Sequence, residues 1–243
     1  TNAQTGTIGI GYYALNALTT GANNVAIGYN AGKTATTGAS NVYIGYAVAD
    51  NAHLDSTANV AIGLNAFGGS HTGSASGENV AIGNGAMGAG IINGVTGAVA
   101  VGGSALTAIT SGAGNVAVGY QAMLESTTGE KNTVVGYQAA AAFDAGESKN
   151  VVIGWNAGLS LDGGVDDNVI IGHNAGVGGA VSTIAGCVVI GSEAMNSTLT
   201  SDQTGTIAIG KSALTAITSG EGNLAIGFRA LQQHTTGARN IAI

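Results

Sequence analysis

The sequence predicts an all-β protein, a parallel β-solenoid of about 14 rungs with 17 to 20 residues in each rung. Three observations predict this fold class. A short motif, Asn-Val-Ala-Ile-Gly in its commonest form, recurs along the whole chain. Its two β-branched residues, at positions i and i+2, favour a strand. The glycine that follows them, and the Thr-Thr-Gly or Thr-Ser-Gly turn before six of the motifs, mark where strands end and begin.

The motif glycine divides the chain into successive units. The aligned glycines are Gly11, Gly28, Gly45, Gly63, Gly83, Gly102, Gly119, Gly136, Gly154, Gly172, Gly191, Gly210 and Gly227, and a truncated last unit ends at Ile243. Helical repeats need about 33 residues or more, and leucine-rich repeats need a leucine scaffold that is missing here. We therefore expect residues 1–243 to form a single repetitive solenoid segment, a fragment of a longer fibre chain.

The columns of the alignment each predict a structural role. The two aliphatic positions of the motif, such as Val25 and Ile27, share one face of a strand, and we expect them to point into the coil. Alanine stands three residues after the motif glycine, from Ala14 to Ala230, and Val48 is the one replacement. We expect this residue at a second inward position. Asparagine precedes the strand in ten of the fourteen units, where its side chains can hydrogen-bond from rung to rung.

The middle residue, between the two aliphatic positions, is then expected to face outward. It is never charged, and an exposed apolar stripe indicates an interface. We therefore predict that this column forms the interface between identical chains, unless another segment of the same chain, outside 1–243, covers it. The predicted interface residues are Ala26, Tyr43, Ala61, Ala81, Ala100, Ala117, Val134, Val152, Ile170, Val189, Ala208 and Ala225.

Aromatic residues often occupy the position directly after the motif glycine. An outward ridge of this kind can stack on sugar rings or pack on a receptor. The alternative is a structural role, in which the rings shield the corner backbone or cover the edge of a neighbouring chain. The candidate receptor contacts are Tyr12, Tyr29, Tyr46, Tyr120, Tyr137, Trp155 and Phe228, and His173 lies at the same position of its unit.

Composition excludes several classes of function. The chain has 43 Gly, no Pro, 8% charged residues and a formal net charge of −7, so nucleic acid and anionic membranes would not be attracted to it. Residues 79–124 carry no charge, but their glycines and repeat rhythm favour more solenoid over a membrane helix. We expect no catalytic residues, no metal and no cofactor, because the titratable side chains are few and scattered. The acidic stretch 162–168 is interpreted as a solvated turn, with calcium binding as the alternative.

The repeated Asn-Val-Ala-Ile-Gly unit resembles the head repeats of trimeric autotransporter adhesins. It is more similar to the Asn-x-Ala-Ile-Gly-Tyr-x-Ala-Leu repeats of bacteriophage tail fibres and related surface proteins that end in an endosialidase-type chaperone domain. The resemblance covers residues 1–243, although the units here are longer and more variable than those of the adhesin heads. It implies a left-handed parallel β-roll in which three identical chains wrap round one axis.

The expected function follows from the fold and the resemblance. We expect a non-enzymatic, homotrimeric segment of an extracellular fibre, on a virion or a bacterial cell surface. Its partners would be its own copies, with a cell-surface glycan or receptor as a further partner. The leading hypothesis is the shaft or receptor-binding segment of a bacteriophage tail fibre, and the second is the head of a bacterial trimeric adhesin. A polysaccharide-degrading tailspike is the third, and the scattered acidic residues count against it.

Overall fold

The computed structural model describes residues 4–52, 55–91, 94–144, 146–161, 163–178, 184–197 and 202–243. The chain forms two compact units, Thr1–Tyr120 and Gln121–Ile243. We call these halves the first and the second unit, and we call a single sequence repeat a rung. It is an all-β parallel β-solenoid of about 12 turns, slightly fewer than the 14 expected, and the described residues form no helix. The predicted fold class is therefore confirmed at the level of a repetitive parallel β-solenoid.

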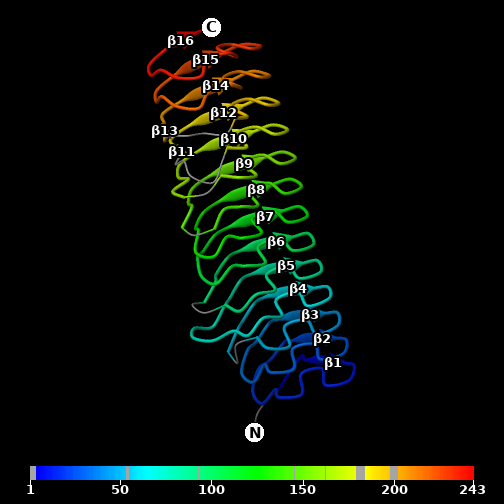
Figure 1. Ribbon diagram of the computed structural model, residues 1–243. Helices are drawn as coiled ribbons and strands as arrows, with labels where there is room; N and C mark the ends of the chain where they lie inside the picture. Colours follow the sequence, from blue (N-terminus) through cyan, green and yellow to red (C-terminus); the bar gives the residue numbers. More distant parts are fainter. Residues whose placement is uncertain are drawn as a thin grey trace. The chain divides into compact units, whose positions relative to one another are not determined.

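The first unit contains seven strands of three residues each. They are β1 (Ile8–Ile10), β2 (Val25–Ile27), β3 (Val42–Ile44), β4 (Val60–Ile62), β5 (Val80–Ile82), β6 (Val99–Val101) and β7 (Val116–Val118). Each strand pairs with the next in parallel, and equivalent residues of the motif are partners (Figure 1). The sequence alignment is thus also the register of the sheet.

The second unit continues the same pattern. Its motif strands are β8 (Thr133–Val135), β9 (Val151–Ile153), β10 (Val169–Ile171), β12 (Val188–Ile190), β14 (Ile207–Ile209), β15 (Leu224–Ile226) and β16 (Ile241–Ala242). They pair in parallel and in register in this order. Two shorter strands, β11 (Ile184–Ala185) and β13 (Gln203–Thr204), pair with each other on another side of the coil.

The direction in which the strand residues point is the reverse of that expected. In every strand from β2 to β15 of the motif series, the middle residue is buried and the two flanking residues are half-buried or exposed. The flanking aliphatic columns therefore form the outer strand face, defined here as the first and third residues of the motif strands. The middle column lies inside the coil of its own chain.

This finding corrects the predicted interface. Residues enclosed by their own chain cannot contact a second chain, so the interface assignment of the middle column was wrong. The residues concerned are Ala26, Tyr43, Ala61, Ala81, Ala100, Ala117, Val134, Val152, Ile170, Val189, Ala208 and Ala225, all with an exposed fraction of 1% or less. Even the Tyr43 side chain is enclosed, and burial raises the pKa of its hydroxyl above the ordinary value.

The core of the coil is completed by two further columns. The alanine three residues after the motif glycine is buried in most rungs, as at Ala31 and Ala86, and Val48 is buried in the same place. The predicted second inward position is therefore confirmed. The residue that follows this alanine, which we name the second core column, is also buried. Its members include Leu15, Ala49, Phe67, Met87, Leu106, Met123, Ala140, Met195 and Leu214.

The middle column and the second core column complement each other in size. Ala61 shares a rung with Phe67, whereas the larger Ile170 shares its rung with Gly176. A Cβ atom added to Gly176 would lie 3.2 Å from Cγ2 of Ile170, so the two positions fill the same space. The coil is narrow, and only one large side chain fits at this level of a rung. The one rung in which both are sizeable carries Val189 and Met195.

A neighbouring rung can also fill the space. Gly32 shares its rung with Ala26, so both positions are small. The ring of Tyr43, one rung further on, takes the room, because a Cβ atom on Gly32 would lie 2.7 Å from Cδ2 of Tyr43. The burial of a tyrosine in this column therefore depends on the glycine beside it.

The second core column has an unusual backbone. Its non-glycine members, such as Leu106, Met123 and Leu214, have φ values of about +50°. This left-handed conformation strains residues with a Cβ atom, and β-branched residues most of all. Accordingly, the column contains Leu, Met, Phe, Ala and Gly but no Val, Ile or Thr.

The motif glycines form the corner after each strand, as predicted. Gly28, for example, has a φ of +135°, and a Cβ atom there would lie 2.1 Å from the carbonyl oxygen of Gly45 in the next rung. The positive φ and the close backbone approach both require glycine. This is why the position is invariant among the repeats of the chain.

The predicted asparagine ladder is confirmed. The amide nitrogens of Asn41, backbone and side chain, both donate to Oδ1 of Asn24, at 2.9 and 3.1 Å, and the Asn41 side chain also donates to the carbonyl of Ser56 at 2.8 Å. Asn59 and Asn79 repeat the arrangement in the next rungs. These buried amides satisfy turn backbone groups that would otherwise be left without partners.

Candidate functional site

The aromatic residues after the motif glycines form an exposed ridge, as predicted. The exposed fractions of these side chains range from 43% for Tyr29 and Tyr137 to 66% for Phe228. The ridge position directly follows the glycine corner, which turns the side chain away from the core. We name this column the aromatic ridge, and its members are Tyr12, Tyr29, Tyr46 and Tyr120 in the first unit and Tyr137, Trp155, His173 and Phe228 in the second.

In the first unit the rings are stacked on one another. Tyr12 and Tyr29 have ring centroids 5.5 Å apart with an interplanar angle of 12°, and Tyr29 and Tyr46 follow at 5.1 Å and 11°. The ring of Tyr120 lies over the backbone of the preceding rung, where a Cβ atom on Gly103 would be 3.3 Å from it. These contacts favour the structural role, because stacked faces are hidden and the corner backbone is covered.

In the second unit the ridge is less uniform. Tyr137 and Trp155 are 6.1 Å apart and tilted by 34°, whereas Trp155 and His173 are stacked at 4.9 Å and 16°. Tyr137 and Trp155 are nevertheless 43% and 49% exposed. Exposed aromatic side chains of this kind can pack against a partner molecule.

Amide side chains run beside the aromatic ridge. The residue after each ridge position is Gln121, Gln138, Asn156 and Asn174 in four successive rungs of the second unit. Gln138 donates a hydrogen bond of 2.7 Å to Oε1 of Gln121. Amides both donate and accept hydrogen bonds. Oδ1 of Asn156 is buried, however, so this oxygen does not face solvent.

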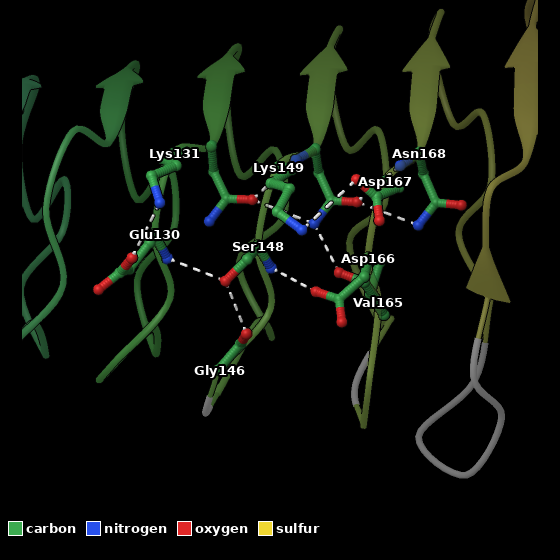
Figure 2. A network of polar contacts seen from close by, with 11 residues as sticks. Glu130, Lys131, Gly146, Ser148, Lys149, Val165, Asp166, Asp167 and Asn168 are labelled. Carbon is green, nitrogen blue, oxygen red and sulfur yellow. Dashed lines mark hydrogen bonds and ion pairs between the residues drawn. The ribbon is translucent and has the colours of Figure 1, made fainter.

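The six basic residues divide into two groups. Lys131, Lys149 and Arg239 form ion pairs with Glu130, Asp167 and Glu221 at 3.4, 3.9 and 3.5 Å. Figure 2 shows the first two pairs in a polar network on the turns of the second unit. There the backbone amide of Ser148 also donates to Oδ1 of Asp166 at 2.7 Å. These lysines are therefore held by local carboxylates.

The other three basic residues lie on or beside the aromatic ridge. The guanidinium carbon of Arg229 is 4.8 Å from the ring centroid of Phe228, and Nζ of Lys33 is 5.7 Å from that of Tyr13. Lys211 occupies a ridge position itself. Within the described residues none of the three has a carboxylate within 4.0 Å of its charged group, although the Asp50 carboxyl interacts electrostatically with Lys33.

The outer strand face is a second candidate surface. It presents Val, Ile or Leu at nearly every rung, with Thr133 as the exception among complete rungs, and it carries no charge. Ile27 and Ile153 are 36% and 37% exposed, and most of the other members are half-buried because the rungs on either side cover them. A continuous uncharged stripe of this kind is typical of an interaction surface.

Catalytic and metal sites are the remaining candidates. Among the residues that the structure describes, no group of three or more His, Cys, Asp or Glu side chains is placed to hold a metal ion. The Cys187 thiol is fully buried, and burial raises its pKa, which disfavours the reactive thiolate. In the acidic stretch 162–168, weighed above as a calcium loop, Asp162 lies outside the described residues.

One carboxyl group is buried in the coil. Glu147 has an exposed fraction of 0%, and burial raises its pKa above the ordinary value, with the neighbouring Asp144 carboxyl raising it further. A raised pKa of this kind is typical of a general acid. Because Glu147 is closed off from solvent, however, a polysaccharide could not reach it, and the pair does not form the open carboxylate groove that a tailspike enzyme needs.

Comparison with known proteins adds no relative. No protein-family model matches the chain, and searches of the curated proteins and of the solved structures found no match. No described helix has the length and hydropathy of a membrane-spanning segment. The class of protein is therefore defined by the fold itself, a repetitive parallel β-solenoid with an aromatic ridge and an aliphatic outer strand face.

Sequence reasoning identified the ridge but missed two features of the site. It assigned the interface to the middle column when the exposed stripe consists of the flanking columns, such as Val80 and Ile82. It also overlooked the basic residues beside the ridge. The signal for the first was present in the sequence, because Ala61 with Phe67 and Ile170 with Gly176 already show that the middle residue competes for core volume.

Proposed function

We propose that this chain is a non-enzymatic structural segment of a homotrimeric extracellular fibre, in the first place the shaft or receptor-binding segment of a bacteriophage tail fibre that attaches to a host surface. The resemblance of its repeats to those of phage fibres and trimeric adhesins supports three chains in left-handed rolls around one axis. The main work of such a segment is mechanical: it holds a binding tip away from the particle, and exposed side chains contact the host.

The observation that carries this proposal is the outer strand face. It presents aliphatic side chains rung after rung in both units, as at Val80, Ile82 and Ile153. A surface with the same rung spacing and the same chemistry is found on every copy of the chain, so copies can pack in register along each unit. Identical subunits that associate in this way usually form closed symmetric assemblies.

The magnitudes permit such an assembly. The strands β1 to β7 present two flanking residues each, fourteen in the first unit. If covering the exposed third or less of one aliphatic side chain is worth about 0.5 to 1 kcal/mol, one unit gains on the order of 10 kcal/mol. Association costs about 4 to 15 kcal/mol in lost freedom. The stripes of the two units together therefore exceed this cost or balance it.

The test is the oligomeric state of the purified chain. Ile82→Glu places a charge on the outer strand face, and it should convert a trimer into a monomer in sedimentation equilibrium. The matched control is Ser74→Glu, an exposed position in the turn between β4 and β5, which should leave the trimer intact. A monomeric unsubstituted chain at micromolar concentration, or a trimer that Ile82→Glu leaves unchanged, would contradict the proposal.

A further inference from the structure

We propose that the stacked tyrosines of the first unit are a site of oxidative cross-linking, in which a carbon–carbon bond joins the rings of Tyr29 and Tyr46 and ties two adjacent rungs together. The inference goes beyond the proposed function, because it concerns a covalent modification within the chain itself. It is argued from the stacking of the rings, their exposure, and the hydrogen bonds that fix the backbone beside them.

The stack occupies three successive positions of the aromatic ridge. Tyr12, Tyr29 and Tyr46 follow the motif glycines of adjacent rungs, and the next two rungs carry Leu64 and Asn84 at this position. The ring centroids of Tyr29 and Tyr46 are 5.1 Å apart, with an interplanar angle of 11°. These two side chains are 43% and 57% exposed, so an oxidant in solution reaches both rings.

The backbone holds the two rings at this separation. The amide of Gly45, before Tyr46, donates a hydrogen bond of 2.8 Å to the carbonyl oxygen of Ile27. The amide of Ala47, after Tyr46, donates one of 2.8 Å to the carbonyl oxygen of Tyr29. Two phenol rings that are joined directly have centres one carbon–carbon bond and two ring radii apart, which is close to the separation in this stack. Rotation of the two exposed side chains is therefore enough to bring Cε of one ring to Cε of the other.

The cross-linking step is an oxidation, and its electron acceptor is hydrogen peroxide acting through a peroxidase. Each phenol loses one electron and its hydroxyl proton, which leaves a tyrosyl radical whose unpaired electron is shared with the two Cε carbons beside the oxygen. A bond forms between one Cε of each ring, and the hydrogen on each of these carbons moves to the oxygen, which restores the phenol. Hydrogen peroxide takes up the two electrons and two protons and leaves as two water molecules. The product has two hydrogen atoms fewer than the unmodified chain.

Several observations select Tyr29 and Tyr46 among the nearby tyrosines. The rings of Tyr12 and Tyr29 are further apart, at 5.5 Å. The Tyr12 hydroxyl is in hydrogen-bond contact with Tyr13, and this contact raises the pKa of Tyr12. Tyr43 is fully buried, so an oxidant in solution does not reach it. Because the chain has a single cysteine, it cannot form an internal disulfide, and a tyrosine cross-link supplies the covalent tie that a disulfide would otherwise provide.

The experiment treats the purified chain with a peroxidase and hydrogen peroxide and locates the bond by trypsin digestion and mass spectrometry. Trypsin cuts after Lys33, between the two rings, so the cross-link should join peptide 1–33 to peptide 34–131 with the loss of two hydrogen atoms. Fragmentation of the joined peptides should place the bond at Tyr29 and Tyr46. On a denaturing gel the treated chain should keep the mass of a monomer, because the bond lies within one chain.

Variants separate this pair from the other tyrosines of the two peptides. Tyr29→Phe keeps a ring in the stack but removes the phenol, so it should nearly abolish the joined peptides, and Tyr46→Phe should do the same. The matched control is Tyr13→Phe, at a side chain of similar exposure, 44%, outside the stack, and it should leave their yield unchanged. The inference would be overturned by the absence of joined peptides, by a larger yield at any other tyrosine pair, by an unchanged yield in Tyr29→Phe, or by a bond between two chains. Each of these outcomes is independent of the oligomeric state that tests the proposed function.

Discussion

Size complementarity inside the coil predicts the behaviour of a double mutant. Ile170 and Gly176 share a rung in which the middle residue is large and the second core column has no side chain. Ala208 and Leu214, in another rung of the same unit, are the inverse pair. The double substitution Ile170→Ala with Gly176→Leu converts the first kind of rung into the second, so the two changes should compensate each other.

The magnitudes follow from the two sites. Ile170→Ala removes a fully buried side chain and should cost about 2 to 5 kcal/mol of unfolding free energy. Gly176→Leu should cost about 1 to 3 kcal/mol or more, because its Cβ atom would lie 3.2 Å from Ile170 and its φ is +54°. In the double mutant the leucine fills the space that the isoleucine left. We expect a coupling energy of about 1 to 3 kcal/mol in favour of the pair.

The assay is urea unfolding, followed by circular dichroism, of the four chains of this cycle at one protein concentration. The midpoints and slopes give the free energies where the transitions are cooperative. A double mutant more stable than Ile170→Ala alone would support the packing described here. Additive losses within about 0.5 kcal/mol would refute it, because they would mean that the two side chains do not share a space.

Three further predictions concern the backbone and the buried carboxyl group. Leu214→Ile should destabilise the chain more than Leu214→Met in thermal melts, because a β-branched residue tolerates φ of +51° poorly, and equal melts would count against this. Gly28→Ala should lower the free energy of unfolding by more than about 2 kcal/mol. Gly97→Ala, with no atom within 4 Å of its added Cβ, should lower it by about 1 kcal/mol. Similar losses for the two variants in urea unfolding would disprove that the close backbone approach at Gly28 requires glycine. Because the pKa of Glu147 is raised in the folded state, its contribution to stability is full below the unfolded pKa and is lost as pH rises through the folded pKa. Glu147→Gln should therefore flatten the fall in stability above about pH 4.5. An unchanged pH profile of stability in this variant would contradict the prediction.

The repeat made the fold readable from the sequence. Spacing, β-branched pairs and the corner glycines predicted the strands and their register, because in a solenoid each rung pairs with the next equivalent rung. The asparagine column was equally informative, since Asn24, Asn41 and Asn59 can satisfy turn backbone groups only if they stack.

The orientation of the strands could not be obtained from the strand motif alone. All three residues of Val60-Ala61-Ile62 are apolar, so alternation gives no inside or outside. The assumption that the largest side chains point inward failed because the coil is narrow and Phe67 already occupies the core of that rung. The left-handed backbone conformation at Phe67 could not be predicted from that residue alone either. It is indicated only by the lack of β-branched residues in the whole second core column.

The aromatic ridge was predictable as a position but not as a surface. The corner glycine before Trp155 indicates an outward side chain, but ring tilt and stacking depend on the neighbouring rungs. The difference between Lys149, which is paired with Asp167, and Lys211, which is not, also depends on which turns lie side by side. Such relations between rungs require coordinates.

The central claim is that the middle residue of each strand points into the coil and the flanking residues point out. The most direct measurement compares the thermal stability of Ala100→Glu and Val101→Glu, neighbours in β6 that are buried and half-buried respectively, by circular dichroism. We expect Ala100→Glu to abolish the folded signal or lower its melting temperature far more, because it encloses a charge in the core. A folded Ala100→Glu beside an unfolded Val101→Glu would show that the faces are reversed.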